Sequence, residues 1–285
     1  MHLSTRFRRG QRLWLLLLPT LLWIGLLFVL PHIKLFLLSF MDRRSGAFTL
    51  ANYAAFFNSS LYRNVFVRTT TFSIVTTLLT LFISFPAAFI ITKVLGRKMK
   101  ALALIAIVLP YWVSELIQAF TWMILFRETG VLSYLLQYLG ITHHNIEFLY
   151  HNSTIVVGLV YTSLLFMTIP IINSLDTLDD SLIEAAYDLG GDFWSTMREI
   201  IIPHAAPGIM VGSIMVFMLN LGNYVTVTLL GGKNSLWFTE SIYNQFIVRF
   251  NQNQGAAFGV ILLTFSVLFV WIVLKITKQD LTEAM

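Results

Sequence analysis

One carboxylate lies well inside an apolar run of the sequence. Glu115 falls about 14 residues into the run at 101–126, which corresponds to roughly 21 Å along a helix and therefore to a depth near mid-bilayer. An ionised carboxylate at that depth costs about 2.5–3.5 kcal/mol and needs a partner or a wet cavity. Two interpretations stay open: a site for a cationic solute, or a structural carboxylate that is hydrogen-bonded to a neighbouring helix or lies near the outer surface.

Aromatic residues flank this carboxylate at Tyr111, Trp112 and Trp122. If the run forms one continuous helix, Trp112 and Trp122 share the face of Glu115, because they lie three and seven residues from it. Aromatic faces attract ammonium groups, so the set would suit a cation such as a polyamine.

A second polar group occurs in the apolar run at 205–230. Asn220, Asn223 and Tyr224 are spaced i, i+3 and i+4 and would occupy one helix face. They could line a pathway, although hydrogen bonding between helices is the favoured interpretation.

Catalytic and metal chemistry find little support in the sequence. It contains no GxxxxGK[ST], no Gly-x-Ser-x-Gly and no His-Glu-x-x-His, so we expect neither ATP binding by a P-loop nor catalysis by this chain. His143 and His144 are adjacent and lack a second ligand at suitable spacing, and there is no cysteine, so we expect no metal site.

The segment 181–203, SLIEAAYDLGGDFWSTMREIIIP, is the one amphipathic stretch between long apolar runs. Asp179, Asp180 and Ser181 could each cap a first helix, and Ser181 with Glu184 has capping-box spacing. Gly190 followed by a second glycine would end that helix. Asp192 would cap a second helix that extends to about residue 201, where Pro203 marks its end or a bend. We expect two short helices joined by a glycine turn, offered to a soluble partner.

These groups must be positioned by helices that cross a membrane. The 285 residues are 57% hydrophobic and 12% charged, with a mean hydropathy of +0.76, whereas soluble domains have about 25% charged residues. The sequence predicts an all-α integral membrane protein with six spans, and short helices outside them at 52–57 and 131–139. The six predicted spans are 13–40 (with a kink near Pro31), 65–94, 101–126, 153–175, 205–230 and 256–276.

The placement of charge predicts the topology. Eleven Lys and Arg residues fall on the side that holds both termini, clustered at 6–12 and 93–100, and eight fall on the other side. By the positive-inside rule, both termini and the segment 181–203 are cytoplasmic. The net charge of +5 therefore reflects topology and does not indicate nucleic acid.

The segment 181–203 resembles the cytoplasmic loop of permease subunits from binding-protein-dependent ABC importers. That loop has the pattern EAA, three residues, G, nine residues, I-x-L-P, and the chain has Glu184, Ala185, Ala186, Gly190 and Pro203 at matching positions. Ile200 also matches, and Ile202 replaces the usual Leu. The resemblance implies a coupling helix that docks in the ATPase subunit, with Asp188, Phe193 and Trp194 on the same surface.

Much of the chain is also similar to the first permease subunit of spermidine/putrescine importers and of their opine or aminobutyrate relatives. The resemblance implies a type I importer fold, with an N-terminal helix and periplasmic loop at 1–64, a five-helix core at 65–277 containing the coupling loop 179–203, and a cytoplasmic tail at 278–285. It implies a second permease subunit, an ATPase dimer that uses ATP and Mg, and a periplasmic substrate-binding protein. It implies no cofactor for this chain itself.

We therefore expect a non-catalytic permease subunit of the bacterial inner membrane that moves a small cationic solute, with polyamine favoured, by alternating access. Opine, aminobutyrate or amino-acid-like substrates are the alternative. An ion-coupled secondary transporter would need several ionisable groups in its spans, where only Glu115 is a candidate. A structural subunit of a membrane enzyme would often supply histidine ligands within its spans, whereas His32 and His204 lie at span ends.

Overall fold

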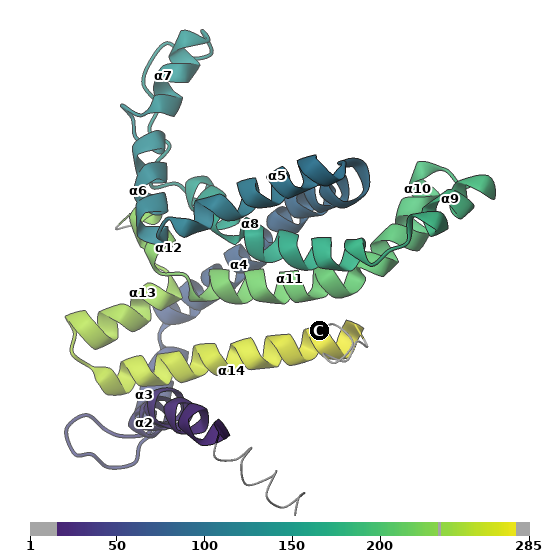
Figure 1. Cartoon of the computed structure of the whole chain (residues 1–285). Coiled ribbons are helices and arrows are strands. Elements are labelled where there is room, and N and C mark those ends of the chain that lie inside the picture. Colours follow the sequence, from purple (N-terminus) through teal and green to yellow (C-terminus); the bar gives the residue numbers. More distant parts are fainter. Residues whose placement is uncertain (1–15, 233–234, 278–285) are drawn as a thin grey trace, which may run out of the picture. The chain divides into compact units, whose positions relative to one another are not determined.

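The computed structural model describes residues 16–232 and 235–277, and within these ranges the chain is helical apart from turns and one isolated β-bridge between Met41 and Phe48 (Figure 1). The predicted basic cluster at 6–12, the first residues of span one and the tail at 278–285 lie outside the described residues. The α-helices are α2 (Leu30–Ser39), α3 (Ala51–Asn58), α4 (Ser60–Phe89), α5 (Arg97–Val108), α6 (Glu115–Phe126), α7 (Val131–Tyr138), α8 (Asn152–Asp176), α9 (Asp180–Asp188), α10 (Phe193–Thr196), α11 (Ile202–Gly222), α12 (Val225–Gly231), α13 (Phe238–Tyr243) and α14 (Gln252–Thr277).

The described residues contain five helices that are long and apolar enough to span a membrane, and a sixth span if one bent pair is counted as one. The all-helical membrane fold predicted from the sequence is therefore confirmed. The five helices are Leu16–Ser39, Ser60–Val94, Asn152–Asp176, Phe193–Gly222 and Gln252–Lys275, and the bent pair is Arg97–Trp112 with Glu115–Tyr138.

The chain divides into two compact units, of which the first combines residues up to Ser60 with Ile242–Phe265. In its apolar helix, a π-helical turn at Gly25–Val29 directly precedes Pro31, where the kink is predicted. The amide of Asn253 donates to the carbonyls of Leu38 and Met41, at 3.1 and 2.9 Å, and so ties the start of α14 to the end of α2.

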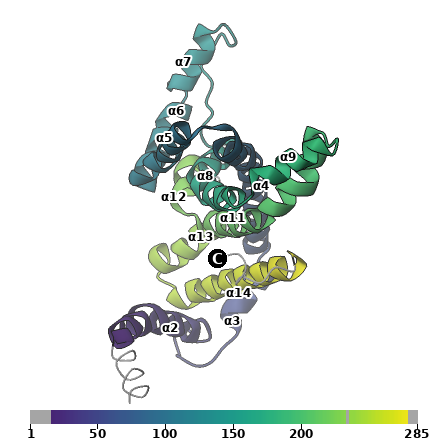
Figure 2. The same ribbon diagram turned by 45° about the vertical axis from the view of Figure 1, so that its right-hand side comes forward.

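The second unit combines Leu61–Ser241 with the residues from Ser266 onward. Its helices α4, α8 and α11 lie side by side in both views, with α9 and α10 projecting from the end of α8 and α11 (Figures 1 and 2). The predicted division at residues 64 and 277 stays a prediction.

Small hydroxyl side chains let α4 pack closely against its neighbours. Its buried residues are Val65, Thr69, Ser73, Thr76, Thr77, Thr80, Ser84 and Ala88. Several of the hydroxyls donate to the carbonyl four residues earlier, for example Thr80 to Thr76 at 2.8 Å, and Thr168 of α8 donates to Ser84 at 3.0 Å. Small residues are common at helix contacts in a bilayer because they let the backbones approach closely. The hydrophobic effect does not drive these contacts, since the lipid tails are as apolar as the side chains.

The third predicted span is broken, which corrects the expectation of one helix over 101–126. A 3₁₀ turn covers Leu109–Trp112, Val113 and Ser114 are extended, and α6 starts at Glu115 with a 94° change of direction. Pro110 lies in this turn and has no N–H to continue the α-helical hydrogen bonds, so a break near it is expected. Glu115 is thus the first residue of a helix rather than the middle of one.

The fifth predicted span is also shifted and broken. Its helix begins at Phe193 and ends at Gly222, after which Asn223 is extended and α12 starts at Val225. Asn220, Asn223 and Tyr224 therefore do not share one helix face, because only Asn220 belongs to α11.

Candidate functional site: a polar hollow and a projecting helical hairpin

Both helix breaks open onto one polar hollow of about 540 Å³. Five of the seven residues predicted for a substrate pathway line it, although the helical-face argument that selected them was wrong. The lining residues are Tyr111, Val113, Ser114, Glu115, Gln118, Thr162, Ser163, Phe166, Leu219, Asn220, Gly222, Asn223, Tyr224 and Val225.

Glu115 joins the two breaks. Its Oε1 atom accepts a hydrogen bond from Nδ2 of Asn223 at 2.7 Å and another from Oγ1 of Thr226 at 2.9 Å. Asn223 also accepts from the backbone N–H of Thr226 at 3.1 Å and so caps α12. A carboxylate in the first turn of α6 is further favoured by the helix dipole. The structural interpretation of Glu115, a hydrogen bond to a neighbouring helix, is therefore correct, while one carboxylate oxygen has no hydrogen bond of its own among those described.

Gln118 satisfies the backbone that the first break exposes, and sequence reasoning missed it. Its amide donates to the carbonyls of Pro110 and Val113, at 2.8 and 2.9 Å, and its side chain is buried. The carbonyl of Pro110 also accepts from the N–H of Val113 at 3.2 Å, so Gln118 matters most for the carbonyl of Val113, because an unpaired carbonyl is costly at membrane depth. The sequence signal that could have identified Gln118 is a glutamine within an apolar run, eight residues after Pro110.

Tyr111 pins the 3₁₀ turn to α8. Its hydroxyl accepts from the N–H of Leu165 at 2.8 Å and donates to the carbonyl of Tyr161 at 3.1 Å. These two groups lie four residues apart, as the partners of a regular helix bond do, so the hydroxyl inserts into the backbone ladder of α8.

Asn220 bridges α8 and α11 at the wall of the hollow, as the interhelical interpretation predicted. Its Oδ1 accepts from Oγ of Ser163 at 2.9 Å, and the residue is 1% exposed. Its Nδ2 has no hydrogen-bond partner among the described residues.

The two tryptophans lie outside the lining of the hollow. Trp112 precedes the break, so it is not on the helix face of Glu115, and it is 85% exposed. Trp122 stacks against Phe126 and packs edge-on against Tyr161. Trp122 lies in α6 seven residues after Glu115, so it shares that helix face as predicted, whereas the prediction for Trp112 is wrong.

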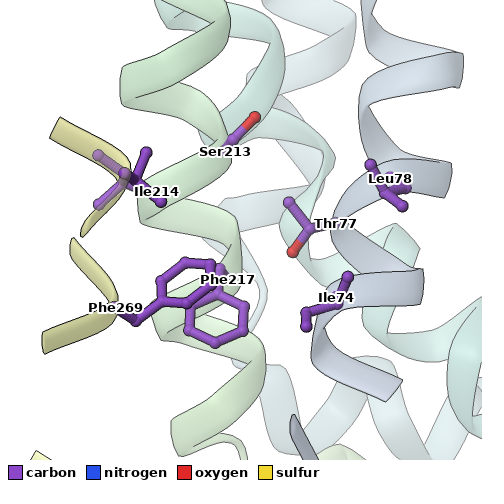
Figure 3. A pocket seen from close by; sticks show the side chains of 8 residues that line it. Ile74, Thr77, Leu78, Ser213, Ile214, Phe217 and Phe269 are labelled. Carbon is purple, nitrogen blue, oxygen red and sulfur yellow. The ribbon is translucent and has the colours of Figure 1, made fainter. Parts of the chain in front are cut away.

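A second hollow, of about 170 Å³, has a different character (Figure 3). Ile74, Thr77 and Leu78 of α4 face Ser213, Ile214 and Phe217 of α11, and Phe217 stacks on Phe269 with ring centroids 3.8 Å apart. The hydroxyl of Thr77 donates to the carbonyl of Ser73, within its own helix. This almost wholly apolar lining offers a polar solute little, so the hollow at Glu115 is the better candidate.

The segment 179–203 forms the predicted pair of helices. Asp179, one of the three predicted cap residues, caps α9, because its carboxylate accepts from the N–H of Ser181 at 3.0 Å. This bond and the side-chain bond to Ser181 hold the pKa of Asp179 below its ordinary value. The predicted Ser181–Glu184 capping box therefore does not form.

Gly190 ends α9 with a left-handed φ of +87°, as predicted. The N–H of Gly190 donates to the carbonyl of Tyr187 and that of Gly191 to the carbonyl of Ala186, both at 2.9 Å. These two bonds form a Schellman motif. A Cβ at Gly190 would meet nothing within 4 Å, whereas one at Gly191 would lie 2.7 Å from the carbonyl oxygen of Ala186.

Asp192 caps α10, as predicted, in a reciprocal capping box with Ser195. Its side chain accepts from the Ser195 N–H at 2.8 Å, and the hydrogen bonds from Ser195 hold its pKa below the ordinary value. The second helix does not end near residue 201, so of the two roles predicted for Pro203, an end or a bend, the helix end is wrong. The helix continues through a π-helical turn at Met197–Ile201 into α11, where Pro203 lies in the first turn.

The hairpin, meaning α9 and α10 with their glycine turn, presents apolar side chains to solvent. Leu189 is 90% exposed and Trp194 74%, and Leu182, Tyr187 and Phe193 are also exposed. Glu184, Ala185 and Asp188 are exposed on α9, whereas Ala186 is half-buried. Contiguous exposed apolar side chains on a hairpin outside the spans mark an interaction surface.

Comparison with known proteins identifies the family. The family described as "Binding-protein-dependent transport system inner membrane component" matches residues 47–279. The chain belongs to this family. It is accordingly a multi-pass permease of the inner membrane, a transport component of ABC importers.

Relatives and solved structures agree with this assignment. The spermidine/putrescine transport system permease protein PotB of Salmonella typhimurium (strain SL1344) is 32% identical to the permease over 245 residues, covering 84% of this chain and 85% of that protein. The inner membrane ABC transporter permease protein YdcU of Escherichia coli (strain K12) is 31% identical over 288 aligned positions, covering 95% and 91%.

The fold is also similar to that of a solved structure with low sequence identity. A crystal structure of a bacterial ABC transporter involved in import of the acidic polysaccharide alginate matches the permease with a TM-score of 0.83, covering 98% of this chain and 99% of that one, at 18% identity. The permease therefore has the type I importer fold predicted from its sequence.

Proposed function

We propose that the permease carries a small cationic solute, with polyamine favoured, through the hollow at Glu115 by alternating access. The observation that carries the proposal is the polar hollow itself, where two broken helices meet around one carboxylate. Broken helices with freed polar groups commonly build solute sites near the middle of a membrane transporter. The permease's similarity to a spermidine/putrescine permease supports the choice of cation.

The energy would come from ATP and Mg bound to a partner ATPase dimer, and the permease itself would bind no cofactor and catalyse no reaction. The exposed apolar hairpin supports this, because both of its helices are capped and it offers the ATPase a docking surface. The residues of this surface would be Glu184, Ala185, Ala186, Asp188, Gly190, Phe193 and Trp194. A second homologous permease subunit and a periplasmic substrate-binding protein would complete the importer. The hairpin and both termini would face the cytoplasm.

The test is ATP hydrolysis and uptake by the complete complex in proteoliposomes, with its binding protein loaded in turn with polyamines, amino acids, opines and aminobutyrate. We expect a polyamine to stimulate both activities. Stimulation by another solute class alone would remove the polyamine and keep the ABC importer. Uptake that proceeds without ATP but requires an ion gradient would contradict the ATP-driven mechanism.

A further inference from the structure

Two lysines contact the hairpin root, which we define as residues 176–180, from the last residue of α8 to the first residue of α9. Nζ of Lys93 lies 2.6 Å from Oδ1 of Asp180 and 2.6 Å from the carbonyl oxygen of Leu178. Nζ of Lys100, near the start of α5, lies 2.5 Å from Oδ1 of Asp176. Lys93 belongs to the π-helical turn Ile90–Val94 that ends the α4 span, a local geometry often found at functional positions.

The burial of the two lysines separates a strong tie from a weak one. The side chain of Lys93 is 9% exposed and contacts the carbonyl of Leu178, a core residue, whereas its ion-pair partner Asp180 is 74% exposed. An ammonium group at this depth is costly to leave without its partners, so separating residues 178–180 from Lys93 costs more than separating an exposed pair. The side chains of Lys100 and Asp176 are 28% and 39% exposed, and an ion pair open to water contributes much less.

The hairpin root also contacts the start of α11. Oγ1 of Thr177 lies 3.0 Å from Nε2 of His204, and Oγ of Ser174 donates to the carbonyl of His204 at 2.9 Å. The hairpin is already joined through the chain to α8 and α11. Lys93 adds a polar contact with the end of α4, which the chain does not join to the hairpin directly, beside the edge-on packing of Phe89 of α4 against Phe193 of α10.

We infer that Lys93 is a positioning residue that transmits movement of the hairpin to α4. The inference rests on the proposed function, because it assumes that an ATPase moves the hairpin. With the tie in place, α4, α8 and α11 rock together as one body, which is how packed helices transmit small displacements. Without it, the hairpin moves more independently of α4, and more ATP is hydrolysed for each solute imported.

The test is Lys93→Met in the complete complex with its binding protein, which keeps the apolar stem and removes the charge. We expect assembly and basal ATP hydrolysis to stay within about twofold of wild type, while the ATP consumed per solute imported rises about tenfold, the factor that corresponds to about 1.4 kcal/mol. Lys93→Arg should restore most of the coupling, because it restores the charge. Lys98→Met is the matched control, since Lys98 is exposed in the same basic turn and has no ion pair among the described residues.

Hydrogen exchange in the assembled complex provides a second, independent readout. We expect faster exchange of α9 amides in Lys93→Met but not in Lys98→Met. Unchanged exchange together with a wild-type ATP-to-solute ratio overturns the inference. Equal loss of assembly in Lys93→Met and Lys93→Arg also overturns it, because the lysine then serves folding alone. A wild-type complex that lacks ATP-driven uptake contradicts the proposed function instead, and the exchange comparison still decides whether Lys93 holds α9.

Discussion

At the residue scale, Oε1 of Glu115 accepts both of the hydrogen bonds that hold the carboxylate in place, and the proposed function assigns the other oxygen to the solute. Oε1 is occupied by Asn223 and Thr226 from the second helix break, so the position of the carboxylate does not depend on a bound cation. A structural carboxylate and a solute-binding carboxylate are thus compatible in one residue. The proposed binding role depends on its charge, and the structural role depends on its hydrogen-bond geometry.

The substitution Glu115→Gln separates these two roles. Glutamine keeps an oxygen acceptor for Asn223 and Thr226 but removes the charge, so we expect normal insertion and assembly. For a cationic solute, uptake at subsaturating concentration should fall about ten- to a hundredfold, since ion pairing in a partly wet site contributes about 1.4–2.7 kcal/mol. The measurement is initial uptake rate against solute concentration in proteoliposomes.

Glu128→Gln is the matched control for this substitution. Glu128 is an exposed carboxylate in the turn after α6 and does not line the hollow. Its loss should leave uptake unchanged. Equal uptake by Glu115→Gln and wild type would show that the solute does not bind the carboxylate of Glu115 during transport.

At the element scale, the hairpin owes its stiffness to local capping rather than to burial. Each of its helices starts with an aspartate cap, and the first ends in a Schellman turn. None of the residues of α9 is buried, which is unusual for an ordered helix of nine residues. Isolated helices of that length are marginal, so the caps and the root contacts must supply the order.

Gly190→Arg should abolish ATP-driven uptake while leaving the permease inserted. The φ of +87° at Gly190 costs an L residue about 1–2 kcal/mol, and the long side chain would also stand between the hairpin and its partner. Gly190→Asn is the milder comparison, because asparagine tolerates the left-handed conformation. The measurement is uptake together with co-purification of the ATPase. Normal uptake by the arginine variant would rule out the coupling role of the hairpin.

Low pH should destabilise the first turn of α10, because it protonates the capping carboxylate of Asp192. The pKa of Asp192 is lowered in the folded state by the hydrogen bonds from Ser195, so its stabilising contribution is complete above the ordinary aspartate pKa and is lost as pH falls through the lowered one. Hydrogen exchange of the first α10 amides, corrected for intrinsic rates, should therefore accelerate several-fold below about pH 4. Asp192→Asn keeps an acceptor without titrating, so its exchange should not change over this window. A pH-independent wild type would contradict this account of the cap.

At the scale of the whole molecule, the placement of charge and the type I fold together support one orientation. The basic turn at Arg97, Lys98 and Lys100 and the hairpin lie at the same end of the second unit, joined by Lys93 and Lys100. Positive charge near span ends favours the cytoplasm. That placement would bring the exposed hairpin to the compartment where an ATPase works.

The absence of cysteine makes this orientation directly testable. Gly96→Cys places a thiol in the basic turn, where an added Cβ meets nothing within 4 Å, and Ala47→Cys places one in the exposed loop before α3. A membrane-impermeant maleimide applied to cells with a permeabilised outer membrane should label the Ala47→Cys variant. The Gly96→Cys variant should be labelled only after the inner membrane is also permeabilised. The reverse pattern would invert the topology and remove the hairpin from the cytoplasm.

The sequence by itself determined the features that depend on local chemistry. Apolar run length predicted that the chain spans a membrane, the spacing from Glu184 to Pro203 predicted the hairpin and the family resemblance, and Gly190 and Asp192 predicted its turn and second cap. Each of these follows from residues close together in the chain, where periodicity and capping rules apply. The same local rules left the first cap open, because Asp179, Asp180 and Ser181 are all competent caps and the structure selects Asp179.

Only the tertiary structure decided how the polar residues of the spans are arranged. Periodicity assumed continuous helices through Glu115 and Asn223, whereas the chain breaks at both places and the breaks face each other. A helix break is tolerated in a membrane only when other groups satisfy the freed backbone, as the side chain of Gln118 does for the carbonyl of Val113. Likewise, Lys93 and Asp180 are 87 residues apart, and no local pattern links them. The family follows from the local pattern, while the hollow and the tie to α4 follow from long-range packing.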